Sequence, residues 1–125
     1  MKATTGQTRP KVLIVDDDDD VREVVSQTLS ASRYDVKAFS DGADAIEAAR
    51  HESFDLAVVD LKMPGTSGAT VIKEIKKRQP DLPVVVITGS LDPSQEGLDG
   101  MFSRLLHKPF RIEELRKTVE EVLSR

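Results

Sequence analysis

The sequence predicts an α/β fold, in which helices cover both faces of a five-stranded parallel sheet in a doubly wound arrangement. Strand-like and helix-like segments alternate along the chain, which is typical of βαβ units. Three of the strand-like segments are apolar runs, rich in β-branched residues and without a polar face: Lys11–Val15, Leu56–Val59 and Pro83–Ile87. Strands of this kind are buried on both sides, as in a parallel sheet between two layers of helices.

The composition is that of a single globular domain. The 125 residues are 38% hydrophobic and 32% charged, which is ordinary for a domain with its own core. There is no cysteine, so disulfide bonds and thiolate metal sites are excluded. The net charge of −4 disfavours direct binding to nucleic acid, which requires a basic patch.

The chain divides into a short tail and one domain. Residues 1–10 are a polar tail without the apolar segment of a signal peptide, and residues 11–125 are interpreted as the domain. No apolar run is long enough to cross a bilayer. We therefore expect a cytoplasmic protein without a membrane partner.

The first strand, Lys11–Val15, leads into five consecutive aspartates. The last three, Asp18–Asp20, suit the first turn of a helix over Val21–Ala31, because negative charge there meets the positive end of the helix dipole. Asp16 and Asp17 instead follow a buried strand, where two like charges are unfavourable unless a cation neutralises them. Mg²⁺ prefers such carboxylate oxygens. The residues of this helix at helical spacing are Val21, Val24, Val25, Thr28 and Leu29.

The remaining elements follow from the same patterns. Ser40 or Asp41 can cap the second helix and Ser67 the third. The helices predicted after the first are Ala43–Arg50, Gly68–Gln79 and Ile112–Ser124. The other strands are Asp35–Phe39, which alternates polar and apolar residues, and Leu105–His107, a short apolar run. In the last helix, the residues expected to face the core are Ile112, Leu115, Val119, Val122 and Leu123.

Polar side chains end four of the five strands. They are Asp16 and Asp17 after the first strand, Asp60 after the third, Thr88 after the fourth and Lys108 after the fifth. Because crossovers between parallel strands are right-handed, all carboxyl ends meet at one edge, where open α/β sheets place their sites. The sequence therefore predicts one site that contains these five side chains.

These side chains suit phosphoryl transfer to a carboxylate. A carboxylate alone is a poor nucleophile toward phosphorus because like charges repel, and a bridging Mg²⁺ ion removes that repulsion. Asp60 would then attack and become an aspartyl phosphate. Lys108 would pair with one phosphoryl oxygen, and Thr88 would donate a hydrogen bond to another.

Four segments, in order along the chain, resemble the receiver domain of two-component response regulators. They are Val12–Asp18, Val58–Gly65, Val86–Gly89 and His107–Phe110. The resemblance extends from about Lys11 to Ser124 and implies a CheY-like, flavodoxin-like fold with strand order 2-1-3-4-5. It implies a signalling switch rather than an enzyme, with a histidine kinase or histidine phosphotransfer protein as phosphodonor and a downstream protein or domain as output.

The resemblance also implies the ligands of a Mg²⁺ ion. Asp17 would bind the ion directly, together with Asp60, and Asp16 would act mostly through a metal-bound water. The backbone carbonyl of Lys62 would complete the protein ligands.

For the phosphoryl group, the resemblance implies that Asp60 is the acceptor. Thr88 would be the switch hydroxyl, and Lys108 would pair with the phosphate. The Lys108–Pro109 peptide bond would be cis, which suits a proline in a tight turn.

Two features depart from the family pattern. Leu105 stands where relatives usually have a tyrosine or phenylalanine that turns inward on activation. The segment before it contains Pro93, Gly97 and Gly100, and glycines weaken a helix by about 1 kcal/mol each relative to alanine. We therefore expect the fourth helix of the family to be short or irregular here.

Two other functions are alternatives to that of a phosphoacceptor. One is a receiver-like interaction domain that acts without phosphorylation; the intact set of site residues argues against it. The other is a phosphohydrolase with an aspartate nucleophile, which is disfavoured because the chain has no cap or insertion that could enclose an organic substrate.

Overall fold

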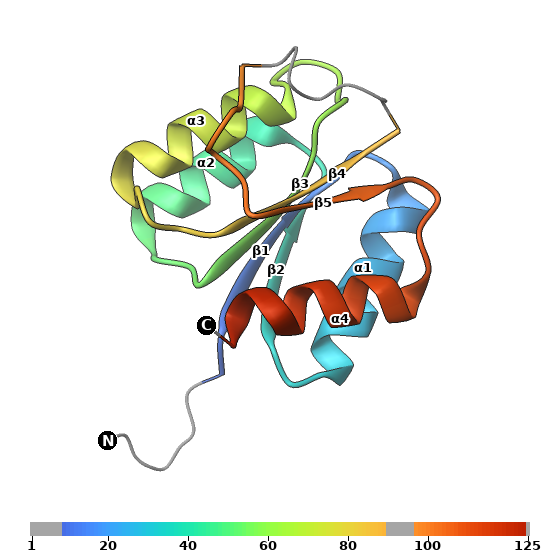
Figure 1. Ribbon diagram of the computed structural model, residues 1–125. Coiled ribbons are helices and arrows are strands. Elements are labelled where there is room, and N and C mark those ends of the chain that lie inside the picture. Colours follow the sequence, from blue (N-terminus) through green and yellow to red (C-terminus); the bar gives the residue numbers. More distant parts are fainter. Residues whose placement is uncertain (1–8, 90–96, 125) are drawn as a thin grey trace, which may run out of the picture.

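A computed structural model describes residues 9–89 and 97–124, which contain five strands and four helices (Figure 1). The strands are β1 (Lys11–Val15), β2 (Asp35–Phe39), β3 (Leu56–Asp60), β4 (Val84–Thr88) and β5 (Arg104–His107). The helices are α1 (Asp19–Ala31), α2 (Gly42–His51), α3 (Gly68–Arg78) and α4 (Ile112–Leu123). All nine of these elements are predicted from the sequence, and no end differs from its predicted position by more than two residues.

The strands form one parallel sheet in the order β2-β1-β3-β4-β5, which confirms the predicted fold class and strand order. The register sets which residues meet at its carboxyl edge. Val15, the last residue of β1, pairs with Val59 of β3. Asp16 is therefore level with Asp60, and the two carboxylates leave the sheet side by side.

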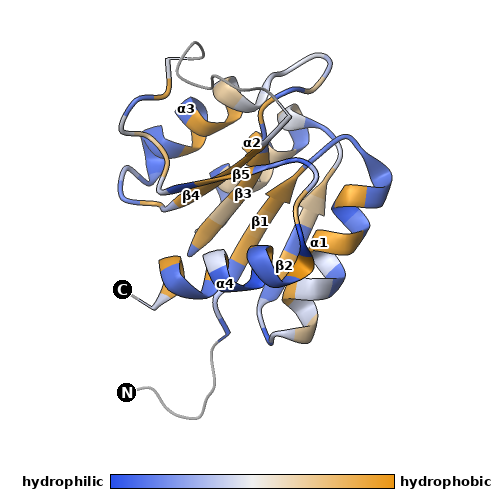
Figure 2. Cartoon of the chain, turned by 45° about the vertical axis from the view of Figure 1, so that its right-hand side comes forward, coloured by the Kyte–Doolittle hydropathy of each residue, from blue (hydrophilic) through white to orange (hydrophobic). Residues whose placement is uncertain are grey.

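The core lies in two layers, one on each face of the sheet. Alternate residues of a strand face opposite sides: Leu13 and Val15 pack toward α2 and α3, whereas Val12 and Ile14 pack toward α1 and α4. Figure 1 shows these two helix pairs on opposite faces, and Figure 2 shows that the central strands are among the most hydrophobic segments. The double burial explains why β1, β3 and β4 have no polar face.

Two apolar side chains are more exposed than their sequence positions suggest. The expectation that Ile112 faces the core is wrong: it is 54% exposed, because it is the first residue of α4 and the buried stripe begins one turn later at Leu115. Val24 is 39% exposed. The buried residues of α1 are Val25 and Leu29, and Val24 lies about 100° around the helix from Val25.

Two expectations fall mainly outside the described residues. The polar tail consists largely of residues 1–8, and the expected short or irregular helix before β5 begins in residues 90–96. Residues 97–103, which the structure describes, form turns and bends. Leu98 in this segment is completely buried on the α2–α3 side of the sheet. Every helix in the described part of the chain is too short or too polar to cross a membrane.

Helix α3 is fixed to β3 at both ends. At its start, Gly68 packs so closely that a β-carbon there would lie 2.1 Å from the carbonyl oxygen of Asp60 and 2.6 Å from Cα of Leu61. Just past its end, the side-chain amide of Gln79 both accepts from and donates to the backbone of Phe54, each at 2.9 Å. The backbone at Asp60 is therefore held firmly against α3.

Replacing Gly68 with alanine should destabilise the fold by about 3 kcal/mol or more, because the added methyl group overlaps backbone atoms that cannot move without shifting α3 or β3. Urea denaturation measures the loss. Gly89→Ala is the matched control: among the described residues, a β-carbon at Gly89 meets nothing within 4 Å, so the free energy of unfolding should change by less than about 1 kcal/mol. Equal stability of the two variants would contradict the close contact between α3 and β3.

Candidate functional site

The connection between β1 and α1 places two aspartates at the carboxyl edge of the sheet. Asp16 directly follows β1, and its N–H donates to the carbonyl of Phe39 at the end of β2 (3.1 Å). Asp18 is the N-cap of α1, since its carboxylate accepts from two N–H groups of the first turn at 2.9 and 3.2 Å. The helix consequently begins at Asp19, earlier than its apolar pattern indicates.

Asp16 and Asp17 have different environments although they are neighbours. Asp16 is 1% exposed, whereas Asp17 is exposed to solvent. Oδ1 of Asp16 accepts from the N–H of Asp18 at 2.9 Å. Its Oδ2 is buried and accepts no hydrogen bond from the described residues. A buried oxygen with an unused lone pair is costly unless a cation or water satisfies it.

Asp60 is the last residue of β3 and is 3% exposed. Its Oδ1 accepts from the backbone N–H of Lys62 and its Oδ2 from Nζ of Lys108, each at 3.3 Å. These hydrogen bonds are long, so both carboxylate oxygens are only loosely held. The side chain can therefore exchange these partners for others at little cost.

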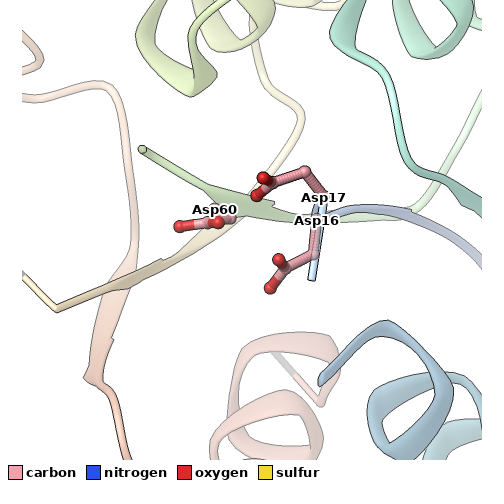
Figure 3. A group of neighbouring side chains, drawn as sticks. All are labelled: Asp16, Asp17 and Asp60. Carbon is pink, nitrogen blue, oxygen red and sulfur yellow. The ribbon is translucent and has the colours of Figure 1, made fainter. Parts of the chain in front are cut away.

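The three carboxylates form one cluster at the carboxyl ends of β1 and β3 (Figure 3). One oxygen from each of Asp16, Asp17 and Asp60 lies within 4.8 Å of the others. A hard divalent cation such as Mg²⁺ prefers carboxylate oxygens as ligands, and this cluster offers three carboxylates, one of which has the unsatisfied Oδ2 of Asp16. The residues present thus fit a cation of this kind.

Lys108 balances part of this negative charge. Its Nζ lies 3.2 Å from Oδ2 of Asp16 and 3.3 Å from Oδ2 of Asp60. The contact with Asp16 has the distance of an ion pair but not the alignment of a hydrogen bond, which agrees with the unsatisfied Oδ2. Burial disfavours the charge of Lys108, but the two carboxylates outweigh it and raise the pKa of the ammonium above its usual range.

The pKa of Asp60 is raised to about 6. Burial is the largest cause, because it disfavours the charged form, and the negative charge of Asp16 acts in the same direction. Lys108 lowers the pKa and offsets only part of these effects. Without a further cation, the cluster therefore opposes full ionisation of Asp60.

The other predicted site residues lie close to this cluster in the chain or the fold. Thr88 ends β4 and is completely buried, and its carbonyl accepts from the N–H of Lys108 at 2.9 Å. This bond connects the ends of β4 and β5. Lys62 has an exposed side chain and follows Asp60 by two residues. The Lys108–Pro109 peptide bond is cis, as the resemblance implied.

Two residues that are not predicted from the sequence also shape the site. Gly68 packs on the backbone of Asp60, a contact between chain segments that no local pattern reveals. Arg22 donates from its guanidinium to the carbonyl of Asp16 and to the carboxylate of Asp19. The spacing of Asp19 and Arg22, three residues apart on a helix, predicts their ion pair but not the bond to Asp16.

Comparison with known proteins gives relatives along almost the whole chain. PrrA, a transcriptional regulatory protein of Mycobacterium tuberculosis, is 36% identical over 123 residues, which are 97% of this chain and 53% of PrrA. The chain thus spans about half the length of this curated relative. Residues 12–120 match the family model of the response regulator receiver domain.

Solved structures agree with this match. The chemotaxis protein CheY4 of Vibrio cholerae superposes with a TM-score of 0.86 at 33% identity, covering 93% of this chain and 100% of CheY4. The BeF3-activated receiver domain of DrrB superposes with a TM-score of 0.83 at 29% identity, covering 94% of this chain and 100% of that domain. The matched residues 12–120 are most of the chain and include the three clustered aspartates and Lys108. This chain therefore belongs to the response regulator receiver domain family.

Proposed function

We propose that this chain is the phosphoacceptor module of a two-component phosphorelay and that Asp60 accepts the phosphoryl group. The arrangement of charge around Asp60 carries the proposal. Two further carboxylates lie within 4.8 Å, and a single lysine contacts both Asp60 and Asp16. Such a site carries more negative than positive charge, and a divalent cation would restore the balance and offset the negative charge that a phosphoryl group adds.

Asp17 and Asp60 would bind a Mg²⁺ ion directly, together with the backbone carbonyl of Lys62, and Asp16 would act mostly through a metal-bound water. When bound, the ion neutralises the negative charge between the nucleophile and the phosphoryl oxygens. The exposed Asp17 offers an oxygen on the solvent side, and the buried Asp16 offers a fixed oxygen to a metal-bound water. Only a few protein ligands would be involved, so binding would be weak and water would complete the coordination.

Asp60 acts as the nucleophile. One of its carboxylate oxygens attacks the phosphorus of a phosphohistidine; the P–O bond forms, the P–N bond breaks, and the electron pair returns to the imidazole nitrogen of the donor. Lys108, which contacts Asp60 before the reaction, then forms an ion pair with a phosphoryl oxygen instead. Thr88, at the end of the next strand, donates its hydroxyl to another oxygen and so couples phosphorylation to the sheet.

Membership of this family supports a signalling switch, which changes conformation when it is phosphorylated, rather than an enzyme that turns over a substrate. This chain would act in the cytoplasm, with a histidine kinase or histidine phosphotransfer protein as donor and a downstream protein or domain as output. PrrA is about twice as long as the matched region, which is consistent with an output domain in that relative. The existence of a BeF3-activated DrrB receiver domain supports activation at the corresponding site here.

With Mg²⁺ and acetyl phosphate, the protein should gain one phosphoryl group that is stable in acid and labile in base. Intact-protein mass spectrometry counts the groups. Asp60→Asn should abolish the gain, whereas Asp20→Asn, which removes an exposed carboxylate of the same acidic run, should retain it. Equal labelling of the Asp60 variant would refute the assignment of the acceptor. No labelling of the wild-type protein would favour an interaction domain that acts without phosphorylation.

Millimolar Mg²⁺ should raise the melting temperature, because a ligand that binds only the native state stabilises it. The gain should shrink in Asp17→Asn and persist in Asp20→Asn. Differential scanning fluorimetry at constant ionic strength separates this effect from general screening. A melting curve that does not respond to Mg²⁺ would rule out the proposed metal site.

In EDTA, Asp60→Asn should be more stable than the wild-type protein at neutral pH. The pKa of Asp60 is about 6 in the folded state and 3.8 as its reference value, so the folded state binds more protons between these pH values. Wild-type stability should therefore fall as pH rises from about 4 to 7, and the variant should escape this loss, which is roughly 1–3 kcal/mol. Urea denaturation at several pH values measures it. Parallel pH profiles for the two proteins would contradict the raised pKa.

A further inference from the structure

Arg22 connects the first turn of α1 to the strand end that carries the acidic cluster. Its Nη1 donates to the backbone carbonyl of Asp16 at 2.9 Å, and its Nη2 donates to a carboxylate oxygen of Asp19 at 2.5 Å. The side chain of Arg22 is 23% exposed and its bond to Asp16 is partly buried, whereas the side chain of Asp19 is 84% exposed. One guanidinium therefore holds both ends of the turn between Asp16 and Asp19.

The bonds of Arg22 help to assign different tasks to the consecutive aspartates. Asp18 is occupied as the N-cap of α1, and Asp19 is paired with Arg22. The Asp17 carboxylate forms no hydrogen bond or ion pair with the described residues and stays within reach of Asp16 and Asp60. Without Arg22, the carboxylate of Asp19 would lose its partner, and the carbonyl of Asp16 would lose a charge-assisted hydrogen bond.

We propose that Arg22 is a positioning residue for the cation site. By fixing the Asp16 carbonyl and holding Asp19 aside, it presents the carboxylates of Asp16 and Asp17 to the cation in a ready-made arrangement. The inference rests on the metal site of the proposed function. It adds a residue that touches neither the cation nor the phosphoryl group.

Removal of Arg22 would change the affinity for a divalent cation in opposite directions, depending on whether Arg22 acts by positioning the ligands or only by its charge. The positive charge of Arg22 repels a divalent cation, so its removal would tighten binding if charge alone mattered. If Arg22 positions the ligands, its removal weakens binding, because the freed turn must be ordered each time a cation binds. Replacement of partners outside the ligand shell commonly lowers metal affinity by about tenfold or more.

The affinity of the purified 125-residue chain for Mn²⁺ tests the proposal. Mn²⁺ prefers oxygen ligands, as Mg²⁺ does, and its free form is counted by electron paramagnetic resonance. Arg22→Gln should raise the dissociation constant about tenfold. Arg22→Lys keeps the charge but cannot donate to two acceptors in a fixed fork, so it should also weaken binding, by about threefold or more.

Arg116→Lys is the matched control. Arg116 makes the same kind of ion pair three residues apart on a helix, with Glu113 on α4, but outside the acidic cluster. Its replacement should leave Mn²⁺ affinity unchanged. Urea denaturation in EDTA establishes that each variant is folded, and the conservative Arg22→Lys keeps the test valid should Arg22→Gln unfold.

Two results would overturn the proposal in distinguishable ways. If both Arg22 variants bind Mn²⁺ as tightly as the wild-type protein, or more tightly, Arg22 does not position the site, although the site itself stands. If the wild-type protein binds no Mn²⁺, the metal site fails, and the role of Arg22 fails with it.

Discussion

Crowding of like charge at one edge of the sheet is the constraint on which the rest of the site depends. The pairing of Val15 with Val59 puts Asp16 level with Asp60, and both carboxylates are almost completely buried. One lysine contacts them, at 3.2 and 3.3 Å, and cannot neutralise two carboxylates and the nearby Asp17. Because positive charge is short, a cation stabilises the native state, and a phosphoryl group would compete with Asp16 and Asp60 for Lys108.

The fold holds these charges together by fixing the backbone around them. The close contact at Gly68 and the Gln79 hydrogen bonds anchor α3 near the two ends of β3. Arg22 does the same for the turn after β1. Because the backbone is fixed, the repulsion cannot be relieved by moving the strands apart. It must be relieved by protonation or by a cation, and each of these changes the charge of the site.

Much of the fold could be predicted from the sequence because apolar runs report burial directly. The three runs without a polar face required a sheet covered on both sides, and the polar residues after them had to meet at one edge. The periodicity of apolar residues shows which face of a helix is buried, but not where along the helix the burial begins. It placed Ile112 on the stripe of Leu115 but could not show that the first turn of α4 lies beyond the buried part. The contacts of Gly68 and Arg22 join separate elements, and only the three-dimensional arrangement reveals them.

The most direct test of the central claim is the pKa of the Asp60 carboxyl group, measured by carbon-detected NMR titration of the metal-free protein. The charge balance described above predicts a pKa of about 6. Saturating Mg²⁺ should move it well below its ordinary range, since the ion favours the ionised form. An ordinary pKa in EDTA that does not respond to Mg²⁺ would contradict the view that unbalanced negative charge governs this site.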